Sequence, residues 1–310
     1  MNLVLLSGNA NLPLATKISQ YLDIPIGKAF VGSFSDGETR VELQTNVRGR
    51  DVFVVQSTCA PVNHHIMELL AIVDACKRAS ASQITVVTPY FGYARQERKS
   101  VPRTPITAKL IADLFQAAGI HRLVALELHN AAIQGFFNVP VDHLYINPVL
   151  AAYLEQESQE YLVVSPDAGG VERARSLAKH FGWGLAIIDK RRDKPNDSTV
   201  MHVIGHVEGK RCLIIDDIVD TGGSLVKAAE ALRAKGALSV SAAITHPVLS
   251  GKAVESIQQS CLDRLVVADS IPLSAAAQQC DKIVQITVGE LLAKAILRIH
   301  THDSISSLFG

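Results

Sequence analysis

Residues 213–224 read LIIDDIVDTGGS. An apolar run leads into three carboxylates and a Thr-Gly-Gly-Ser turn, and the next residues, LVKAAEALRAKG, have the apolar spacing of a helix. A buried strand, a polar turn and a helix in this order make up half of a βαβ unit. The stretch therefore predicts a parallel sheet with glycines and carboxylates gathered where one of its strands ends.

The same order of apolar run, polar cluster and helical segment recurs along the whole chain. Runs rich in valine and isoleucine begin near residues 3, 52, 84 and 123, and again near 162, 185, 212, 240 and 265. Such near-continuous runs are typical of strands buried on both faces of a parallel sheet. We therefore predict an α/β fold with two domains, residues 1–146 and 147–294, each with a central, mostly parallel sheet flanked by helices.

Composition excludes several classes of protein. The 310 residues are 48% hydrophobic, with 30 basic and 30 acidic residues, so nothing global favours nucleic acid or an anionic membrane as a partner. No run approaches the ~20 apolar residues of a membrane span. The start, MNLVLLSGNANLP, lacks the basic region and long apolar core of a signal peptide. Five cysteines without a C-x-x-C pair are typical of free thiols, so we expect a cytoplasmic protein.

Residues 39–48 follow a different pattern from the apolar runs. Positions 39, 41, 43, 45 and 47 hold apolar or β-branched residues and alternate with polar ones. This is the period of a strand with one exposed face. Asp36-Gly37 just before it is a turn signal. We predict a strand or hairpin whose exposed face meets solvent or another subunit.

Chemistry is expected beyond the carboxyl ends of the strands, where open parallel sheets bind ligands. In residues 220–224, glycines let backbone N–H groups approach an anion, and the helix N-terminus that follows favours negative charge, so a monophosphate fits. Asp216 and Asp217 would repel that phosphate but suit sugar hydroxyls or Mg²⁺. In the alternative interpretation, Asp220 is only a helix N-cap and the two other carboxylates lie in a solvated turn.

Longer motifs extend over nearly the whole sequence. They include FSDGE, NVRGRDVFVVQSTCAPVN, PYFGYARQ, IQGFF, VVSPDAGG, IIDKRR, DDIVDTGGS, THPVLSG and SISSLFG. DDIVDTGGS resembles the phosphoribosyl diphosphate (PRPP) binding motif of type I phosphoribosyltransferases. The full set resembles the ribose-phosphate pyrophosphokinase (PRPP synthetase) family, bacterial class I-like. This resemblance implies two tandem type I phosphoribosyltransferase-like domains, with the tail, about residues 295–310, packed on the first.

The family transfers the diphosphoryl group of ATP to the C1 hydroxyl of ribose 5-phosphate, which gives PRPP and AMP. The resemblance implies that Asp216 and Asp217 face the ribose and that a five-residue loop holds the 5-phosphate. That loop is Asp220, Thr221, Gly222, Gly223 and Ser224. Lys190 and Arg192 match catalytic positions on a mobile flap, and Arg192 also matches a ribose 5-phosphate contact. Two cations on a closing loop suit phosphoryl-type transfer, which needs positioning and positive charge.

The resemblance also implies an ATP site with Mg²⁺ as cofactor. His129 and Asp167 match the Mg–ATP positions, although His129 alone would more often be a satisfied core histidine. Arg95 and Gln96 match ATP contacts, although ARQERK alone would more often be a solvated loop. A hairpin of the neighbouring subunit would contribute four further ATP contacts: Phe34, Asp36, Gly37 and Glu38. We thus expect a homo-oligomer, a hexamer with shared active sites, with ADP and phosphate as possible allosteric effectors.

Four positions depart from the family pattern. Glu127 stands where the family usually has aspartate, and Ala132 replaces a common glutamine. His64 and His65 stand where aspartate and another polar residue are usual. Together with Glu68, one turn further on, the two histidines could suggest a metal site. Because no third ligand is evident, we interpret them as the surface of a helix N-terminus.

Three functions account for parts of the sequence. A PRPP synthetase accounts for all the motifs. A phosphoribosyltransferase that consumes PRPP accounts for DDIVDTGGS, but not for FSDGE, YARQ or the second domain. A non-catalytic regulatory subunit is the remaining alternative, although such relatives carry disrupted motifs and the flap and Mg–ATP positions here are intact. AMP formation that depends on ribose 5-phosphate separates the first function from the other two.

Overall fold

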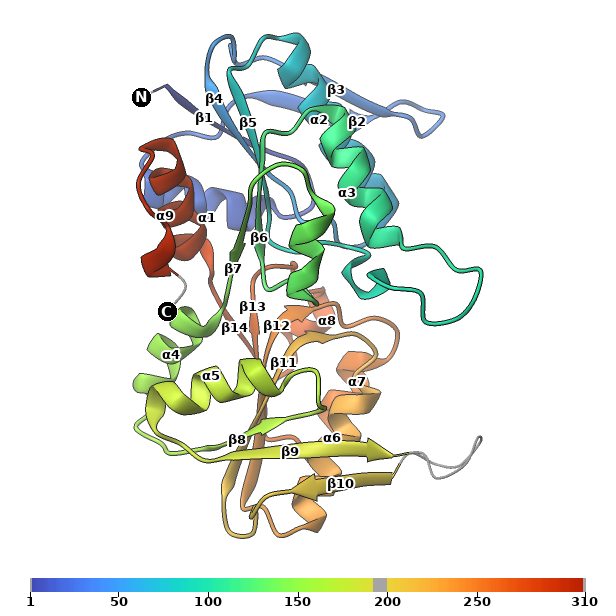
Figure 1. Cartoon of the computed structure of the whole chain (residues 1–310), viewed down its shortest axis with the longest axis vertical. Coiled ribbons are helices and arrows are strands. Elements are labelled where there is room, and N and C mark those ends of the chain that lie inside the picture. The colour runs from blue at the N-terminus through green and yellow to red at the C-terminus, as the bar shows by residue number, and fades with distance from the viewer. Residues whose placement is uncertain (1, 192–199, 309–310) are drawn as a thin grey trace. The chain divides into compact units, whose positions relative to one another are not determined.

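The structure is a computed structural model, and it describes residues 2–191 and 200–308. The chain forms two compact units. The first contains the residues up to Tyr145, together with Ser270–Pro272 and the residues from Thr287 onward, and the second contains the residues between these segments. Each unit has a mainly parallel sheet with helices on its faces (Figure 1). The predicted α/β class with two such units is confirmed.

The first unit is built on a five-stranded sheet of order β1-β4-β5-β6-β7, in which all neighbours are parallel. Its strands are β1 (Leu3–Ser7), β4 (Asp51–Val55), β5 (Gln83–Thr88), β6 (Arg122–Leu126) and β7 (Val141–Leu144). The first four are the apolar runs predicted from the first half of the sequence. Both faces of these strands are buried, which explains why their sequences lack a polar alternation.

Helices cover both faces of this sheet (Figure 1). One face packs against α2 (Val62–Arg78) and α3 (Thr107–Ala118), and the other carries α1 (Leu12–Leu22) and α9 (Gly289–His300). Helices α1 and α9 contact each other, so the end of the chain belongs to the first unit. A short 3₁₀ helix, η3 (Ser306–Leu308), follows α9.

The predicted hairpin is confirmed as a separate, two-stranded antiparallel sheet of β2 (Ala29–Ser33) and β3 (Thr39–Leu43). Three apolar side chains of its inner face pack on the core beneath α2 and α3: Val31, Val41 and Leu43. The strand is shorter than the alternation of residues 39–48 suggested. The N–H groups of Gln44 and Thr45 both donate to the carbonyl of Lys28, which ends the ladder.

The second unit is built on a seven-stranded sheet of order β10-β9-β8-β11-β12-β13-β14. Only β10 is antiparallel to its neighbour. The strands are β8 (Leu162–Ser165), β9 (Leu185–Arg191), β10 (Val200–Ile204), β11 (Arg211–Val219), β12 (Ser239–Pro247), β13 (Arg264–Ala268) and β14 (Ile283–Ile286). Five of them are the predicted runs of the second half.

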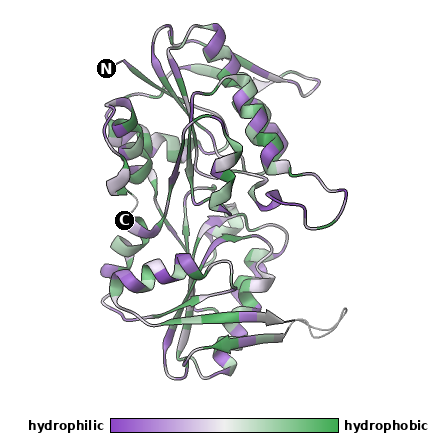
Figure 2. Cartoon of the chain, in the orientation of Figure 1, coloured by the Kyte–Doolittle hydropathy of each residue, from purple (hydrophilic) through white to green (hydrophobic). Residues whose placement is uncertain are grey.

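Two helix pairs bury the two faces of this second sheet. Apolar residues of α4 (Asn147–Glu155) and α5 (Val171–Phe181) form one core with the strands, and those of α6 (Gly223–Ala234) and α7 (Ala253–Gln259) form the other. A short helix, α8 (Ala275–Gln278), precedes β14. Figure 2 shows the strands of both sheets as largely hydrophobic and the helices as mixed. Burial of one helix face and both sheet faces therefore accounts for the repeating sequence pattern.

Strands β7, β10 and β14 were not predicted. All three are short and lie at sheet edges, where little of the strand needs to be apolar. Strand β9 also extends further than expected, since Lys190 lies inside it and not in a loop. Its neighbour β10 pairs Met201 with Lys190, and this ladder satisfies the backbone of the charged residues in an extended conformation.

Membrane-spanning helices and the state of the cysteines can both be checked in the structure. Within residues 2–191 and 200–308, no helix is long and apolar enough to cross a membrane. All five cysteines are free, and four of them are buried. The expectation of free thiols is confirmed.

Candidate active site

Strand β11 of the second unit carries the predicted carboxylate pair. Asp216 and Asp217 lie inside the strand, and Asp217 is only 5% exposed. The backbone N–H of Asp217 donates to Asp216 Oδ1 at 2.9 Å, so the first carboxylate is held against its own strand. The alternative in which the pair lies in a solvated turn is therefore wrong.

The loop after β11 leads directly into α6. Gly222 is the residue before the helix and has φ 77°, in the left-handed region that side chains rarely adopt. It has no side chain to cap the first turn of α6, so the N–H groups there face outward for an anion. Thr221 and Ser224 are exposed beside it. This geometry can bind a phosphate group.

Asp220 begins this loop but does not cap α6. Its carboxylate accepts a hydrogen bond from Ser250 Oγ, and its backbone carbonyl accepts one from the N–H of Ser250 at 3.0 Å. These bonds tie the loop to the segment after β12, the next strand in the sheet. The interpretation of Asp220 as a helix N-cap is therefore wrong, because Gly222 has that position.

Arg173 is a site residue that the sequence did not reveal. It lies in α5 with a side chain 15% exposed, and its Nη1 is 3.6 Å from Asp216 Oδ1 and 3.6 Å from Asp217 Oδ1. The helix α5 follows β8, which neighbours β11 in the sheet. No sequence spacing links residue 173 to the pair. The only signal would have been the adjacency of β8 and β11, which the sequence does not give.

The surroundings of Asp216 change its acid strength. Burial raises its pKa, and the adjacent Asp217 carboxylate raises it further, while Arg173 acts in the opposite direction. The result is a pKa of about 7 in place of the ordinary 3.8. A carboxylate that is costly to ionise gains from a cation or from hydroxyl donors, so this pair is suited to bind a sugar or a metal ion.

Asp167 follows β8 on the same edge of the sheet. Its Oδ1 accepts a hydrogen bond from the N–H of Gly170 at 3.0 Å, and Ser165 Oγ donates to its carbonyl at 2.7 Å. A methyl group at Gly170 would lie 3.8 Å from both Asp167 Oδ1 and Arg173 Nη1. The loop of Asp167, the guanidinium of Arg173 and the carboxylate pair are therefore neighbours within the second unit.

Of the two predicted flap residues, the structure describes Lys190. Lys190 is in β9, whose neighbour β8 ends at Ser165, opposite Ile187. Its backbone is thus three residues beyond the end of β8, on the side that carries Asp167. Arg192 lies outside the described residues.

The first unit holds the predicted nucleotide-binding residues. At the tip of the β2–β3 hairpin, Asp36 Oδ1 accepts from the N–H of Glu38 at 3.0 Å, and Gly37 adopts φ 93°. Phe34 is 50% exposed, and the guanidinium of Arg40 lies over its ring at 5.7 Å from the centroid. The turn thus has a local hydrogen bond, and an exposed aromatic ring stands next to it.

Arg95, Gln96 and His129 lie after two adjacent parallel strands, β5 and β6. The short 3₁₀ helix η1 (Ala94–Gln96) contains the first two, and Gln96 Oε1 accepts from Thr107 Oγ1 at 2.6 Å. His129 precedes the 3₁₀ helix η2 (Ala131–Phe136). The sheet therefore brings these loops to one edge. The hairpin with Phe34 belongs to a different sheet, so the topology does not place it there.

The residues that depart from the family pattern differ in burial and in their hydrogen bonds. Glu127 is 2% exposed with φ 45°, and its N–H donates to the carbonyl of Leu144 at 2.8 Å. Ala132 is exposed, and its N–H donates to Asn130 Oδ1 at 2.9 Å. Glu68 is fully buried and its neighbour His65 is 7% exposed. The interpretation of this trio as a helix surface is therefore wrong for two of its members.

Metal binding by side chains alone has little support in the described part of the chain. There, no three or more His, Cys, Asp and Glu side chains gather in a way that could hold an ion. Mg²⁺ commonly keeps several waters and is held by one or two carboxylates together with substrate phosphates. The carboxylates of the second unit fit that mode of binding, in which the phosphates complete the coordination.

Comparison with known proteins identifies the family. A family model of the N-terminal domain of ribose phosphate pyrophosphokinase matches residues 3–119, and one of the phosphoribosyl synthetase-associated domain matches residues 192–310. Ribose-phosphate pyrophosphokinase from Nitrosomonas europaea is 54% identical over 310 residues, 99% of this chain and 98% of that protein. The chain belongs to the ribose-phosphate pyrophosphokinase family. The family resemblance seen in the sequence motifs is confirmed.

Other ribose-phosphate pyrophosphokinases match to the same extent. The one from Campylobacter jejuni is 52% identical over 304 residues, 98% of this chain and 97% of that protein. The crystal structure of phosphoribosylpyrophosphate synthetase from Mycobacterium smegmatis has a TM-score of 0.92 and 37% sequence identity, and covers 97% of this chain and 100% of that chain. The family's fold therefore extends over both units.

Proposed function

We propose that this chain catalyses the transfer of the diphosphoryl group of ATP to the C1 hydroxyl of ribose 5-phosphate, which gives PRPP and AMP. It is a ribose-phosphate diphosphokinase, and its relatives over nearly the full length are named ribose-phosphate pyrophosphokinase. The observation that supports the site assignment most directly is the end of β11, where a buried and a half-buried carboxylate precede a helix N-terminus that no side chain caps. A molecule with a sugar at one end and a phosphate at the other can bind to the carboxylates and to the helix N-terminus at the same time.

Ribose 5-phosphate is proposed to bind along this loop. Its phosphate accepts hydrogen bonds from the first turn of α6 and from the hydroxyls of Thr221 and Ser224. Its ribose hydroxyls donate to Asp216 and Asp217. Arg173 lies close to both carboxylates, and its positive charge offsets their mutual repulsion. Both can therefore accept hydrogen bonds from the sugar.

ATP is proposed to bind through residues of the first unit. Phe34 offers an exposed ring against which an adenine base can stack. Arg95 and Gln96 follow β5, and His129 follows β6, where they can contact the phosphate chain. Asp36, Gly37 and Glu38 complete the set at the hairpin tip. We propose residues 1–146 as the domain that binds the nucleotide and 147–294 as the domain that binds ribose 5-phosphate.

Mg²⁺ is the proposed cofactor, held by Asp167 and His129 together with the phosphates of ATP. Carboxylate oxygen is the ligand type that Mg²⁺ prefers, and imidazole is the weaker partner of the two. When bound, the ion would neutralise charge on the transferred phosphates.

The chemical step forms a bond between the C1 hydroxyl oxygen of ribose 5-phosphate and the β-phosphorus of ATP. The bond from that phosphorus to the oxygen of the α-phosphate breaks, AMP leaves, and the proton of the C1 hydroxyl passes to solvent. We propose that Lys190 and Arg192 stabilise the negative charge that develops on the leaving oxygen. The position of Lys190 in β9, next to β8, also favours the exclusion of water, which would otherwise hydrolyse ATP.

Assembly, regulation and location complete the proposal. The exposed hairpin tip is suited to reach a neighbouring subunit, so we propose a homo-oligomer, a hexamer with shared active sites. ADP and phosphate are proposed as allosteric effectors. Five free thiols are typical of a reducing compartment, which supports a cytoplasmic location.

Product analysis tests the function. The protein is incubated with ATP, Mg²⁺ and ribose 5-phosphate, and AMP and PRPP are quantified separately. We expect equal amounts of both, and no AMP with an analogue of ribose 5-phosphate that lacks the C1 hydroxyl. AMP formed with that analogue would indicate hydrolysis. A folded protein that binds ATP and forms neither product would favour the alternative, a non-catalytic regulatory subunit.

A further inference from the structure

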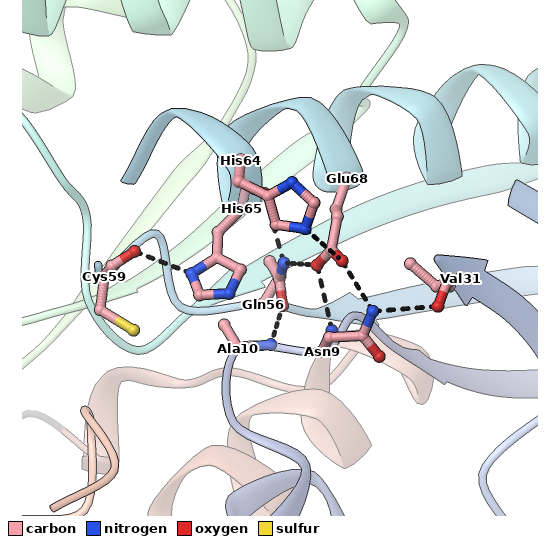
Figure 3. Close-up of polar contacts among 8 residues, drawn as sticks. All are labelled: Asn9, Ala10, Val31, Gln56, Cys59, His64, His65 and Glu68. Carbon is pink, nitrogen blue, oxygen red and sulfur yellow. Dashed lines mark hydrogen bonds and ion pairs between the residues drawn. The ribbon is translucent and has the colours of Figure 1, made fainter. Parts of the chain in front are cut away.

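A buried carboxylate lies at the centre of a polar cluster in the first unit. Glu68 of α2 has no exposed surface. Its Oε1 accepts from Asn9 Nδ2 at 2.6 Å and lies 3.2 Å from His64 Nε2, and its Oε2 accepts from Gln56 Nε2 at 2.9 Å (Figure 3). The backbone N–H of Asn9 donates to Oε2 at 3.2 Å. A buried charge with this many donors is fixed in orientation.

Gln56 extends the cluster to the end of β4. Its Oε1 accepts from the N–H of Ala10 at 3.1 Å, and its Nε2 also donates to the carbonyl of His65 at 3.2 Å. A side chain at Gly8 would overlap the amide of Gln56. Residues 8–10, which follow β1, are thus fitted closely against β4 and α2, and Asn9 has little freedom at its backbone.

Asn9 connects this rigid base to the hairpin. Its Nδ2 donates one hydrogen to Glu68 and the other to the carbonyl of Val31, at 3.1 Å (Figure 3). Val31 lies in β2, three residues before Phe34. The strand β2 pairs only with β3, which packs on α2. The bond from Asn9 therefore fixes β2, which ends one residue before Phe34, on the side where no other strand of the described residues pairs with it.

We propose that Asn9 is a positioning residue of the nucleotide site. Oriented by Glu68, its amide holds β2 in place and thereby sets the position from which Phe34 meets the adenine base. This inference rests on the proposed function, in which the hairpin contacts ATP. It assigns Asn9 no contact with substrate, so its removal should act through the hairpin, with Phe34 as the reporter.

His64 provides a matched control. It contacts the same oxygen of Glu68 as Asn9 does, but it lies on the first turn of α2 and its side chain is 37% exposed. Its imidazole meets Glu68 and the ring of His65, and in the described part of the chain it makes no hydrogen bond to the hairpin. Asn9→Ala and His64→Ala therefore each remove one donor from Glu68, and only the first also releases β2.

The test compares steady-state kinetics of the wild-type protein with Asn9→Ala, His64→Ala, Phe34→Ala and the double variant Asn9→Ala/Phe34→Ala. We expect Asn9→Ala to raise KM for ATP about 3- to 10-fold, as the loss of one or two hydrogen bonds implies. KM for ribose 5-phosphate should stay within about 2-fold. His64→Ala should leave both constants unchanged, and in the double variant the effects of Asn9→Ala and Phe34→Ala should be less than additive. Hydrogen exchange of residues 29–43 should rise only where Asn9 is replaced.

The outcomes separate this inference from the proposed function. If Phe34→Ala leaves KM for ATP unchanged, the assignment of the hairpin to the nucleotide site is wrong, and the role of Asn9 is wrong with it. If Phe34→Ala raises KM while Asn9→Ala does not, only the role of Asn9 is overturned. Equal effects of Asn9→Ala and His64→Ala would also overturn it, because they would indicate a general weakening of the cluster.

Discussion

Replacement of Asp216 by asparagine should make the second unit more stable while it weakens the binding of ribose 5-phosphate. The wild-type carboxylate is costly to keep ionised in the folded protein, because burial and Asp217 raise its pKa to about 7. Asparagine carries no charge. It keeps an acceptor for the N–H of Asp217, which donates to Asp216 Oδ1 at 2.9 Å in the wild type. It loses the contact with Arg173.

The size of the gain follows from the pKa. A rise from 3.8 to about 7 corresponds to about 4 kcal/mol at about 1.4 kcal/mol per pH unit. The side chain of Asp216 retains 26% exposure, so water screens part of this cost, and the lost contact with Arg173 offsets more. We expect a net gain of about 1–3 kcal/mol in the free energy of unfolding above pH 7.

The gain should depend on pH in one direction. A carboxyl whose pKa is raised on folding contributes its full stability below its ordinary pKa and loses it as the pH rises through the folded value. The contribution of Asp216 to the stability of the wild-type protein is therefore lost between pH 3.8 and about 7, and asparagine, which does not titrate, avoids this loss. The advantage of Asp216→Asn should grow across that interval and stay constant above it.

The assay can be specific for the second unit. Trp183 is the only tryptophan of the chain, and it stacks on Phe181 at the end of α5. Urea unfolding followed by its fluorescence at several pH values gives the free energy of unfolding of that unit. Asp281→Asn, at an exposed carboxylate, is the control and should change nothing. An Asp216→Asn protein less stable than the wild type at pH 8, or an advantage that shrinks as the pH rises, would refute the reasoning.

Three further predictions concern other parts of the molecule. Burial acts to raise the pKa of Glu157, but hydrogen bonds from Arg264 and from a tyrosine hold it below its usual range. Glu157→Gln should therefore cost about 1–3 kcal/mol near pH 7, and urea unfolding should show this cost vanish as the pH falls below that range. Lys190→Ala should lower kcat by about 10²–10³ with ribose 5-phosphate affinity retained, as turnover and calorimetry can show. Gly92→Ala should lower the Tm in thermal unfolding, because a methyl group there overlaps the carbonyl of Thr58.

Much of the fold could be read from the sequence because buried parallel strands leave a strong signal. Every apolar run became a strand, and the alternation after residue 38 became β3. The edge strands β7, β10 and β14 left no such signal, since one side of an edge strand is unpaired and few apolar residues are needed. The extension of β9 through Lys190 was missed because it depends on pairing with β10.

The sequence predicted the parts of the candidate site whose residues are close to one another along the chain. Residues 216–224 form one strand-turn-helix segment, so the pattern alone indicated a phosphate loop and a carboxylate pair. Arg173 could not be found this way, because it reaches the pair from the helix that follows a neighbouring strand. Glu68 and His65 were noticed at their helical spacing but were misinterpreted as surface residues. One partner of Glu68 is Asn9, 59 positions away in sequence, so the sequence near Glu68 carried no signal of this contact.

The release of AMP from ATP with and without ribose 5-phosphate tests the central claim most directly, with the wild-type protein and Lys190→Ala in parallel. The account predicts that wild-type AMP release requires ribose 5-phosphate and that the variant loses most of it. AMP release that is independent of ribose 5-phosphate, or none at all from a folded protein that binds both substrates, would contradict the account.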